Sequence, residues 1–514
     1  MEKGENNYPF FHWMPKPLGI TLLILMFIPW MFAGGTYLTN VAEMVGTTGL
    51  WMEDYQLISS CSFLGMSLFF PFMVRYLQTR NVRKIYICGI LLLILINTLL
   101  AHTESVTGQC ALCIVLGFVR VMLVLNTTFV LAPYAVGLDT LAMFTAKEMP
   151  DPKDQYAMDH QRALLMSGLY LLIMVLIQLS NYMVGWIAYE YQWNYSYTLV
   201  NIILGCFLLF VWITMAPVKR NDEHYKIPWQ MTGEVLLMAC FLCATCHVLI
   251  YGKTLDWFSS PKICIGTIVA LVSLGMFICL EICKKGNTYL DLHVFLRRNV
   301  WIGIALFLIT VLANYGNTLM VSYIKMASSA SNLHGAALSL WNILGCVSGY
   351  LLGVIMILRK VRYKYIFGTG LLLMCFSNIY LYFQYQPQRL YDNMILPSVI
   401  NYAGMFMPYA VVCAYGMNRL PAWMLPSWLF LMIAVRNVLA PAASMSIYST
   451  LMQERQQYYI TRFAQDTPDL SDAAKVNGSA ALVGMKETTG DIIWFSGICA
   501  TLVLACPNKW SLKS

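Results

Sequence analysis

Charged residues are scarce in this sequence. Only 11% of its 514 residues are Asp, Glu, Lys or Arg, whereas an ordinary soluble domain has about 25%. Hydrophobic residues make up 59% of the chain, and the mean hydropathy is +0.62. A water-soluble protein of this length could not bury so much apolar surface, which leaves the lipid bilayer as the solvent. Backbone polar groups in lipid must be satisfied within the chain, and the apolar runs are continuous rather than alternating, so we expect transmembrane helices and no β-barrel.

Recognisable sites for metals, cofactors and nucleic acids are also missing. The net charge of +8 is divided among short basic clusters between apolar runs, which is typical of membrane topology signals and excludes a nucleic-acid-binding stripe. The 16 cysteines lie nearly all within or beside apolar runs, where packing is their expected role and no disulfide framework is indicated. His247 and His334 are isolated from other metal ligands. We therefore expect no metal, no cofactor and no enzymatic activity.

What the sequence does contain is a series of long apolar runs. Crossing a bilayer takes about 20 mainly apolar residues. By this rule the sequence predicts an all-α polytopic membrane protein with about fourteen transmembrane helices, arranged as two six-helix transporter halves plus two inserted helices. The predicted spans are Leu18–Leu38, Tyr55–Leu77, Ile85–Leu100, Cys110–Pro133, Ala163–Trp186, Tyr197–Ala216, Thr232–Tyr251, Cys264–Ile282, Val300–Tyr323, Gly335–Leu358, Tyr365–Phe383, Ile395–Gly416, Trp428–Leu451 and Ile492–Cys506.

The basic residues predict the orientation of these spans. Most of the 33 Lys and Arg residues fall in alternate connections, and because such residues are retained on the cytoplasmic side, both termini are predicted to be cytoplasmic. The segment before the first span has no small-residue cleavage site, so we expect this span to be retained in the inner membrane. The predicted parts are a cytoplasmic N-terminus (1–17), an N-terminal six-helix half (18–216), two inserted helices with flanking loops (217–283), a C-terminal six-helix half (284–506) with an outer loop (452–491), and a cytoplasmic C-terminus (507–514).

A basic segment occurs twice. The segment Arg80–Gly89 reappears as Arg359–Gly368, with six of ten positions identical. If spans seven and eight are an insertion, both segments occupy equivalent cytoplasmic places in two parallel halves, an arrangement in which the substrate site lies between the halves near the midplane. We expect these segments to act as cytoplasmic gate loops, although two unrelated basic loops that only set topology are the alternative. The gate residues are Arg80, Arg83, Lys84, Arg359 and Arg362.

Three motifs carry a family resemblance. Tyr251–Ser260 reads Tyr-Gly-Lys-Thr-Leu-Asp-Trp-Phe-Ser-Ser between the two inserted spans, Leu290–Phe295 reads Leu-Asp-Leu-His-Val-Phe, and Gly185–Trp193 closes the fifth span. They resemble segments at the same places in the fourteen-span branch of bacterial drug:proton antiporters, within the major facilitator superfamily. Arg436 resembles an Arg early in the thirteenth span of that branch. The resemblance implies a secondary transporter that exports small, lipophilic molecules by alternating access, coupled to protons.

The chain departs from this branch in several places. In the loop between spans two and three, Arg75, Thr79 and Val82 stand where the family has Gly, Asp and Gly. The fifth-span Gly-Pro pair and the first-span Asp are absent. The missing Asp favours an alternative, a facilitator-type importer or metabolite exporter without proton antiport. A membrane sensor or enzyme without transport is the second alternative.

Charged residues inside spans are the candidates for proton coupling. Placing an Arg at the centre of a membrane costs about 2.5–3.5 kcal/mol on insertion scales, so Arg120 is expected to be functional and paired. In the resembled branch this Arg assists proton coupling, and a structural Arg bonded to carbonyls is the alternative. Asp139 is the nearest candidate carboxylate and Glu43 is an outer alternative. Arg436 either takes part in coupling or extends toward the cytoplasmic interface.

Neutral polar side chains also recur inside the spans. In lipid such groups must face protein or a water-filled cavity, so we expect about half of them to line the substrate cavity and the others to bridge helices. Asn314 and Asn317 are three residues apart and share a helix face, which makes them the strongest pair. The expected partners are a small-molecule substrate, protons, the bilayer and, in a Gram-negative source, a periplasmic adaptor protein. The cavity candidates are Asn126, Gln178, Asn181, Asn314, Asn317, Asn342, Asn401 and Asn437.

Overall fold

The computed structural model describes most of the chain. The described residues are 9–73, 76–77, 81–135, 152–217, 229–284, 289–327, 332–386, 391–417, 420–466 and 473–506. Two predicted site residues, Arg80 and Asp139, lie outside these ranges. Within them the chain is mainly helical, and a β-bridge joins Phe10 to Met215.

The helices have the following bounds. In chain order they are α1 (Lys16–Leu25), α2 (Phe27–Phe32), η2 (Leu38–Asn40), α3 (Val41–Thr48), α4 (Met52–Phe69), η3 (Phe70–Phe72), α6 (Val82–His102), α7 (Val106–Ala135), α9 (Pro152–Glu190), α10 (Tyr195–Thr214), α11 (Trp229–Tyr251), η4 (Trp257–Ser259), α12 (Pro261–Cys283), η5 (Leu292–Leu296), α13 (Arg298–Ala327), α14 (Asn332–Leu358), α15 (Tyr363–Gln384), η6 (Tyr391–Met394), α16 (Ile395–Met417), η7 (Ala422–Met424), α17 (Leu425–Ala434), η8 (Val435–Leu439), α18 (Ala440–Asp466) and α19 (Ala473–Ala505).

The prediction of a polytopic all-α membrane protein is confirmed. Twelve helices in the described part of the chain are long and apolar enough to cross a membrane. The predicted first span is a shorter apolar stretch, Lys16–Phe32. The helix at the second predicted span, α4, carries Glu53 and Asp54 in its first turn. The count of fourteen spans therefore stays a prediction.

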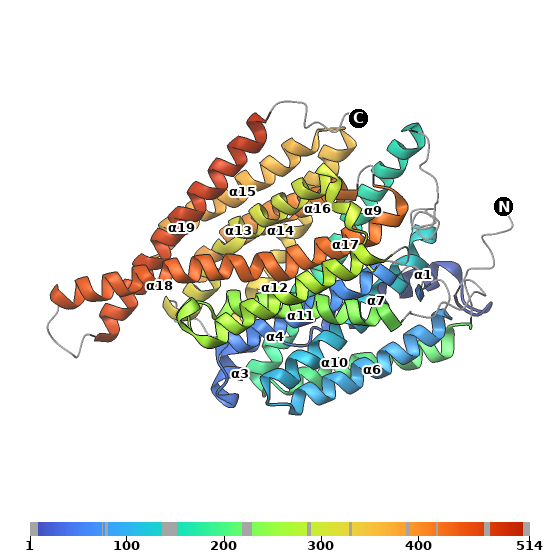
Figure 1. The fold of residues 1–514 in the computed structure, drawn as a ribbon, viewed down its shortest axis with the longest axis horizontal. Helices are drawn as coiled ribbons and strands as arrows, with labels where there is room; N and C mark the ends of the chain where they lie inside the picture. Colours follow the sequence, from blue (N-terminus) through green and yellow to red (C-terminus); the bar gives the residue numbers. More distant parts are fainter. Residues whose placement is uncertain are drawn as a thin grey trace. The chain divides into compact units, whose positions relative to one another are not determined.

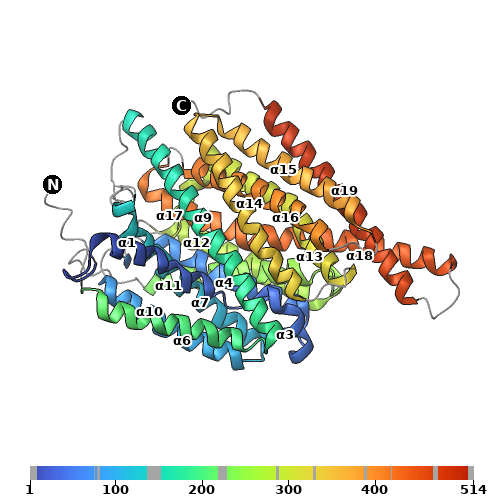
Figure 2. The same cartoon turned by 180° about the vertical axis from the view of Figure 1, so that it is seen from behind.

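The chain divides into two compact units. Unit 1 contains residues 1–161, 190–301 and 417–439, and unit 2 contains residues 162–189, 302–416 and 440–514. Within unit 1, α6 lies beside α10, and α11 lies beside α12 (Figure 1). Within unit 2, α15 lies beside α19 (Figure 2). The predicted six-helix halves follow a different division of the sequence and stay a prediction.

Glycines let the helices of unit 1 approach closely. A Cβ atom on Gly65 of α4 would lie 1.9 Å from the Ile114 carbonyl oxygen of α7. In return, a Cβ atom on Gly117 of α7 would lie 1.8 Å from the Ser62 carbonyl oxygen of α4. Small residues are typical of helix contacts in membranes because backbone packing replaces the hydrophobic effect there. The two glycines therefore hold α4 and α7 in direct backbone contact.

Glycines also allow close helix contacts in unit 2. A Cβ atom on Gly345 of α14 would lie 2.5 Å from the Val399 carbonyl oxygen of α16, and one turn further on Gly349 faces Ala403 in the same way. These contacts bring α14 against α16, the two helices that carry most of the polar side chains described below.

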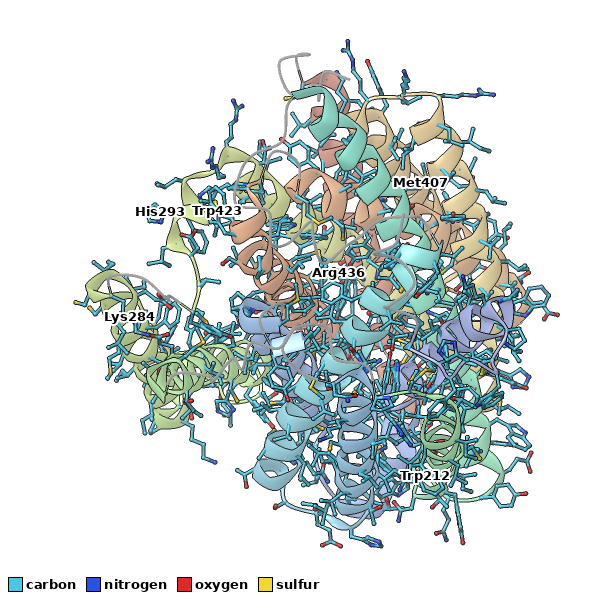
Figure 3. All side chains as sticks on the ribbon, turned by 90° about the vertical axis from the view of Figure 1, so that its right-hand side faces the viewer. Trp212, Lys284, His293, Met407, Trp423 and Arg436 are labelled. Atoms are coloured by element: carbon cyan, nitrogen blue, oxygen red, sulfur yellow. The ribbon has the colours of Figure 1, made fainter. Side chains whose placement is uncertain are left out.

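Two helices of unit 1 are interrupted at positions that matter for the site. The first predicted span is divided between α1 and α2, and α2 ends at Phe32, only three residues after Pro29. Between α17 and α18 the chain forms a π-turn, η8, which contains Arg436 (Figure 3). The thiol of Cys246 on α11 lies 3.9 Å from the Val438 carbonyl oxygen of this turn. Single π-turns within α-helices occur frequently at functional sites.

The segment 452–491, predicted as an outer loop, is helical where the structure describes it, and its place outside the membrane stays a prediction. Helix α18 continues to Asp466, and α19 begins at Ala473. Arg455 holds the two extensions together, with its Nη2 atom 2.7 Å from Asp491 and its Nε atom 3.5 Å from Glu487. Hydropathy did not reveal these helical extensions because it measures the polarity of a segment, and a polar segment can still be helical.

Candidate substrate-binding and coupling residues

A network of neutral polar side chains lies within unit 2. Its centre is Asn342 on α14, which is 4% exposed. The Asn342 Nδ2 atom donates to the Oε1 atom of Gln178 on α9 over 3.4 Å, and its Oδ1 atom accepts from the Ser398 hydroxyl of α16 over 2.5 Å. One amide therefore joins three helices, using both its donor and its acceptor.

Helix α13 enters the network through the predicted pair of asparagines. The Nδ2 atom of Asn401 on α16 donates to the Oδ1 atom of Asn314 over 2.8 Å. The Nδ2 atom of Asn317 lies 3.5 Å from the Tyr402 hydroxyl, which is also hydrogen-bonded to the side chain of Gln178. The two residues of the pair thus contact neighbouring positions of α16.

The network retains unused acceptors. The Oδ1 atoms of Asn317 and Asn401 are buried and accept no hydrogen bond from any described residue. A buried carbonyl oxygen without a donor costs about 1–3 kcal/mol, so a hydroxyl or amide group of a bound molecule, or a water molecule, would be stabilised at either atom. The network itself is uncharged, which suits it to molecules without a formal charge at the point of contact.

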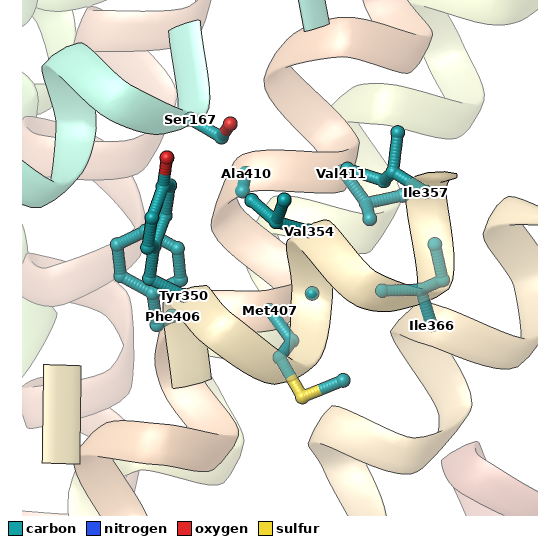
Figure 4. A pocket seen from close by; sticks show the side chains of 10 residues that line it. Ser167, Tyr350, Val354, Ile357, Ile366, Phe406, Met407, Ala410 and Val411 are labelled. Atoms are coloured by element: carbon teal, nitrogen blue, oxygen red, sulfur yellow. The ribbon is translucent and has the colours of Figure 1, made fainter. Parts of the chain in front are cut away.

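A small apolar pocket lies in the same unit (Figure 4). Aromatic rings close one side, because Phe406 packs against Tyr350 and Tyr170 with ring centroids 5.9 and 5.1 Å apart. Ser167 and Tyr350 bring hydroxyl groups to the same end of the pocket. The pocket is lined by Ser167, Tyr350, Gly353, Val354, Ile357, Ile366, Phe406, Met407, Ala410 and Val411.

The other predicted cavity residues do not join this network. Asn126 on α7 is fully buried in unit 1, and neither atom of its amide bonds to a described residue. Asn181 on α9 and Asn437 in the π-turn are half-buried. The structure therefore brings together Gln178, Asn314, Asn317, Asn342 and Asn401 and adds two residues that sequence reasoning missed, Ser398 and Tyr402. The signal was available for Ser398, because it precedes Asn401 by three residues on one helix face.

The guanidinium group of Arg120 lies at the end of α2 in unit 1. Its Nε atom donates to the Trp30 carbonyl oxygen over 2.7 Å, and Nη2 lies 3.4 Å from the Met31 carbonyl oxygen. These carbonyls lack intrahelical donors because α2 ends at Phe32. Arg120 is 5% exposed, and no carboxylate among the described residues pairs with it. In this state Arg120 caps a helix end.

Aromatic and hydroxyl groups fix the end of α2 from the other side. The Trp30 indole donates to the Thr127 hydroxyl of α7 over 3.1 Å and stacks on Tyr86 of α6. Tyr86 also donates to the Thr127 hydroxyl over 3.0 Å. Trp30 is therefore held by its indole while its carbonyl binds Arg120.

The remaining coupling candidates lie elsewhere. Glu43 is half-buried in the first turn of α3, and Arg436 is half-buried in the π-turn. Since Asp139 lies outside the described residues, its predicted pairing with Arg120 stays a prediction.

One predicted gate residue meets a helix end. The Nη2 atom of Arg83, close to the start of α6, donates to the carbonyl oxygen of Trp212, which lies near the end of α10 and is labelled in Figure 3, over 2.6 Å. Its neighbour Lys84 is exposed. In the second copy, Arg359 follows α14 and Arg362 precedes α15, and both are exposed. The structure thus shows a helix-end contact for the first basic segment.

Comparison with known proteins gives similarity over part of the sequence. No family model matches the chain. It is 34% identical over 120 residues to the fatty acid resistance protein FarB of Neisseria gonorrhoeae, and 31% identical over 120 residues to both the probable multidrug resistance protein EmrY and the multidrug export protein EmrB of Escherichia coli K12. The match spans 23% of this chain and 22–23% of each relative. Over that stretch the resemblance to drug efflux proteins is confirmed.

Solved structures resemble the chain over nearly its whole length. A peptide transporter of the POT family in complex with sulfate gives a TM-score of 0.59 at 14% identity and covers 98% of each chain. The nucleoside transporter NupG gives a TM-score of 0.54 at 10% identity and covers 94% of this chain and 98% of that one. The chain has a transporter fold. The matched relatives are named as resistance and export proteins and the structural neighbours as transporters.

Proposed function

We propose that this protein is a transporter that exports small, lipophilic molecules by alternating access and that it is driven by protons. The observation that supports this most directly is the uncharged network in unit 2, in which Asn342 connects α9, α14 and α16. Polar groups inside a membrane bundle carry a cost unless they bridge helices or face a substrate path, and two acceptors of this network are unused.

The chemistry of unit 2 favours lipophilic molecules. An apolar pocket lined by Tyr350, Phe406 and Met407 lies in the unit that holds the amides. Such a surface binds apolar groups by burial, while a few amides fix their orientation. The names of FarB and EmrB refer to fatty acids and to multiple drugs, and we extend this broad class of substrate to the present chain.

Proton coupling would act through Arg120 in unit 1. Here the guanidinium is bonded to the carbonyls of Trp30 and Met31. A second state, in which Arg120 leaves these carbonyls for a deprotonated carboxylate such as Asp139, would couple proton release to movement of α2. We further propose that the chain resides in the inner membrane with both termini cytoplasmic, and that in a Gram-negative cell it joins a periplasmic adaptor.

A facilitator without proton antiport is the second candidate. It is favoured by one observation, the absence of any described carboxylate bonded to Arg120. In that case Arg120 would serve only as the cap of α2.

Flux through the purified protein tests both candidates. The protein is reconstituted in vesicles, and the movement of a lipophilic dye is followed with and without a pH gradient. We expect accumulation against the dye gradient only when the pH gradient is present, and reduced dye affinity in Asn342→Ala. Downhill flux that ignores the pH gradient would support the facilitator, and no flux of any dye or fatty acid would reject the proposed function.

A further inference from the structure

Two carboxylates are buried in the helical hairpin of α11 and α12. Glu234 on α11 is 0% exposed and Glu281 on α12 is 4% exposed, although both helices are long and apolar enough to cross a membrane. Lys284, at the end of α12 and labelled in Figure 3, forms an ion pair with Glu234. Ionisable residues inside membrane helices are costly and are functional by default. None of these three residues takes part in the site described above.

Glu281 holds the chain that follows its helix. Its Oε1 atom accepts hydrogen bonds from the backbone N–H groups of Tyr289 and Leu290 over 3.0 and 3.1 Å. Its Oε2 atom is buried and has no hydrogen-bond partner among the described residues. We call residues Tyr289–Asp291 the strap. Both of these hydrogen bonds from the strap to α12 end on one oxygen of one carboxylate, and the Tyr289 ring also packs edge-on against Phe277 of α12. The other carboxylate oxygen is available to take up a proton.

The strap also fastens two other helices of unit 1. The Tyr289 hydroxyl donates to the Leu68 carbonyl oxygen at the end of α4 over 2.7 Å. The Asp291 N–H group donates to the Ser427 hydroxyl in the first turn of α17 over 3.0 Å. Tyr289 is 2% exposed and lies edge-on to Phe430 of α17. A change at Glu281 therefore acts on α4 and α17 together.

We propose that Glu281 is a proton-binding site and that its protonation loosens the strap from α12. The groups that face it are Glu234 from α11, Lys284 from α12, and the N–H groups and ring of the strap. Two carboxylates lie near one ammonium group, which is ion-paired with Glu234, so one negative charge remains in a buried place, and a proton on Oε2 of Glu281 removes it. No covalent bond other than the new O–H is made or broken.

Protonation weakens the strap because it removes charge from the acceptor. Hydrogen bonds to an ionised group are roughly twice as strong as those between neutral groups. Both bonds at Oε1 lose this assistance when Glu281 becomes neutral, so the strap opens more often and the ends of α4 and α17 are released. In a proton-driven exporter this device would link proton uptake to helix movement, and to that extent it rests on the proposed function.

Hydrogen–deuterium exchange tests the proposal on the full-length protein in lipid nanodiscs. Exchange of the Tyr289 and Leu290 amides is measured between pH 5 and 8 and corrected for the intrinsic pH dependence of exchange. We expect protection to fall by about fivefold to tenfold as the pH is lowered, since two hydrogen bonds each lose about half their strength. Wild-type protection that does not depend on pH would overturn the proposal without any variant.

Variants assign the transition to Glu281. Glu281→Gln should show low protection at every pH, and the exposed Glu190→Gln should behave as wild type. Since His293 is bonded to Asp291 of the strap and can itself titrate, His293→Ala must retain the transition, and its loss in this variant would overturn the proposal. Unchanged exchange in α7 shows that each variant is folded. Exchange is read without substrate or gradient, so a protein that keeps this transition but transports nothing would reject only the proposed function.

Discussion

Arg120 and Trp30 are joined by a 2.7 Å hydrogen bond from the guanidinium Nε atom to the main-chain carbonyl oxygen. The contact explains how an arginine is accommodated in an apolar helix, because the interrupted first span supplies carbonyl groups that need donors. It also means that the charge of Arg120 is held without a carboxylate in this state.

The first prediction concerns this contact. Arg120→Ala leaves buried carbonyls at Trp30 and Met31 unpartnered, at a cost of about 1–3 kcal/mol each, so it should lower the melting temperature and abolish gradient-driven flux. Arg120→Lys should restore stability only in part, because an ammonium group cannot span both carbonyls as a planar fork does. Melting curves and vesicle flux measure the two effects. Wild-type gradient-driven flux in Arg120→Ala would leave Arg120 with a structural role alone.

The second prediction concerns the pair Asn314 and Asn401. Each single change to Ala removes one hydrogen bond, of about 0.5–1.5 kcal/mol, and leaves the amide of the other residue buried without that hydrogen bond. The double variant should bind dye at least as tightly as the single variant of lower dye affinity, because the second substitution removes the amide that the first one left without a partner. Dye affinities of all three variants give the coupling energy. Additive losses would show that the two amides act separately on the substrate.

The third prediction uses two glycines of α14. Gly345→Ala places a methyl group 2.5 Å from the Val399 carbonyl oxygen, which forces α14 away from α16 and should lower the melting temperature. Gly353→Ala is the matched control, because nothing lies within 4 Å of its Cβ position. Alanine there should be neutral or stabilising by up to about 1 kcal/mol. Equal melting temperatures for both variants would contradict the close contact.

The fourth prediction concerns the two basic segments. Replacing Arg83 and Arg362 by Ala removes the contact of Arg83 with the Trp212 carbonyl and the charge at the start of α15. If the segments are gates, the balance between inward-open and outward-open states should shift while expression is unchanged. Accessibility of single cysteines in a cysteine-free background reports this balance. Unchanged accessibility would show that the segments only set topology.

The fifth prediction is the topology. Fourteen spans with both ends cytoplasmic require reporter fusions at either terminus to give a cytoplasmic signal. A fusion in 467–472, between α18 and α19, should give the opposite signal. A C-terminus outside the cell would require an odd number of spans and would contradict the scheme.

Hydropathy predicted the helical class and most spans because long apolar runs have few other solutions in lipid. It could not predict that Pro29 and the end of α2 interrupt the first span, or that polar residues after Leu451 continue α18, since both depend on partners distant in sequence. Five amides in unit 2 were predicted from their polarity alone. Glu234 and Glu281 were overlooked, although a carboxylate inside an apolar run is a readable signal.

The contact between α4 and α7 has a mechanical consequence. Gly65 and Gly117 press backbone against backbone at two points three residues apart on each helix, about 4.5 Å along the axis. Sliding one helix past the other by a single residue would drive a side chain into a carbonyl group. We therefore expect α4 and α7 to move as one rigid body. Leu68 at the end of α4 and Arg120 on α7 should then move together. A displacement of Leu68 by the strap would therefore also displace Arg120.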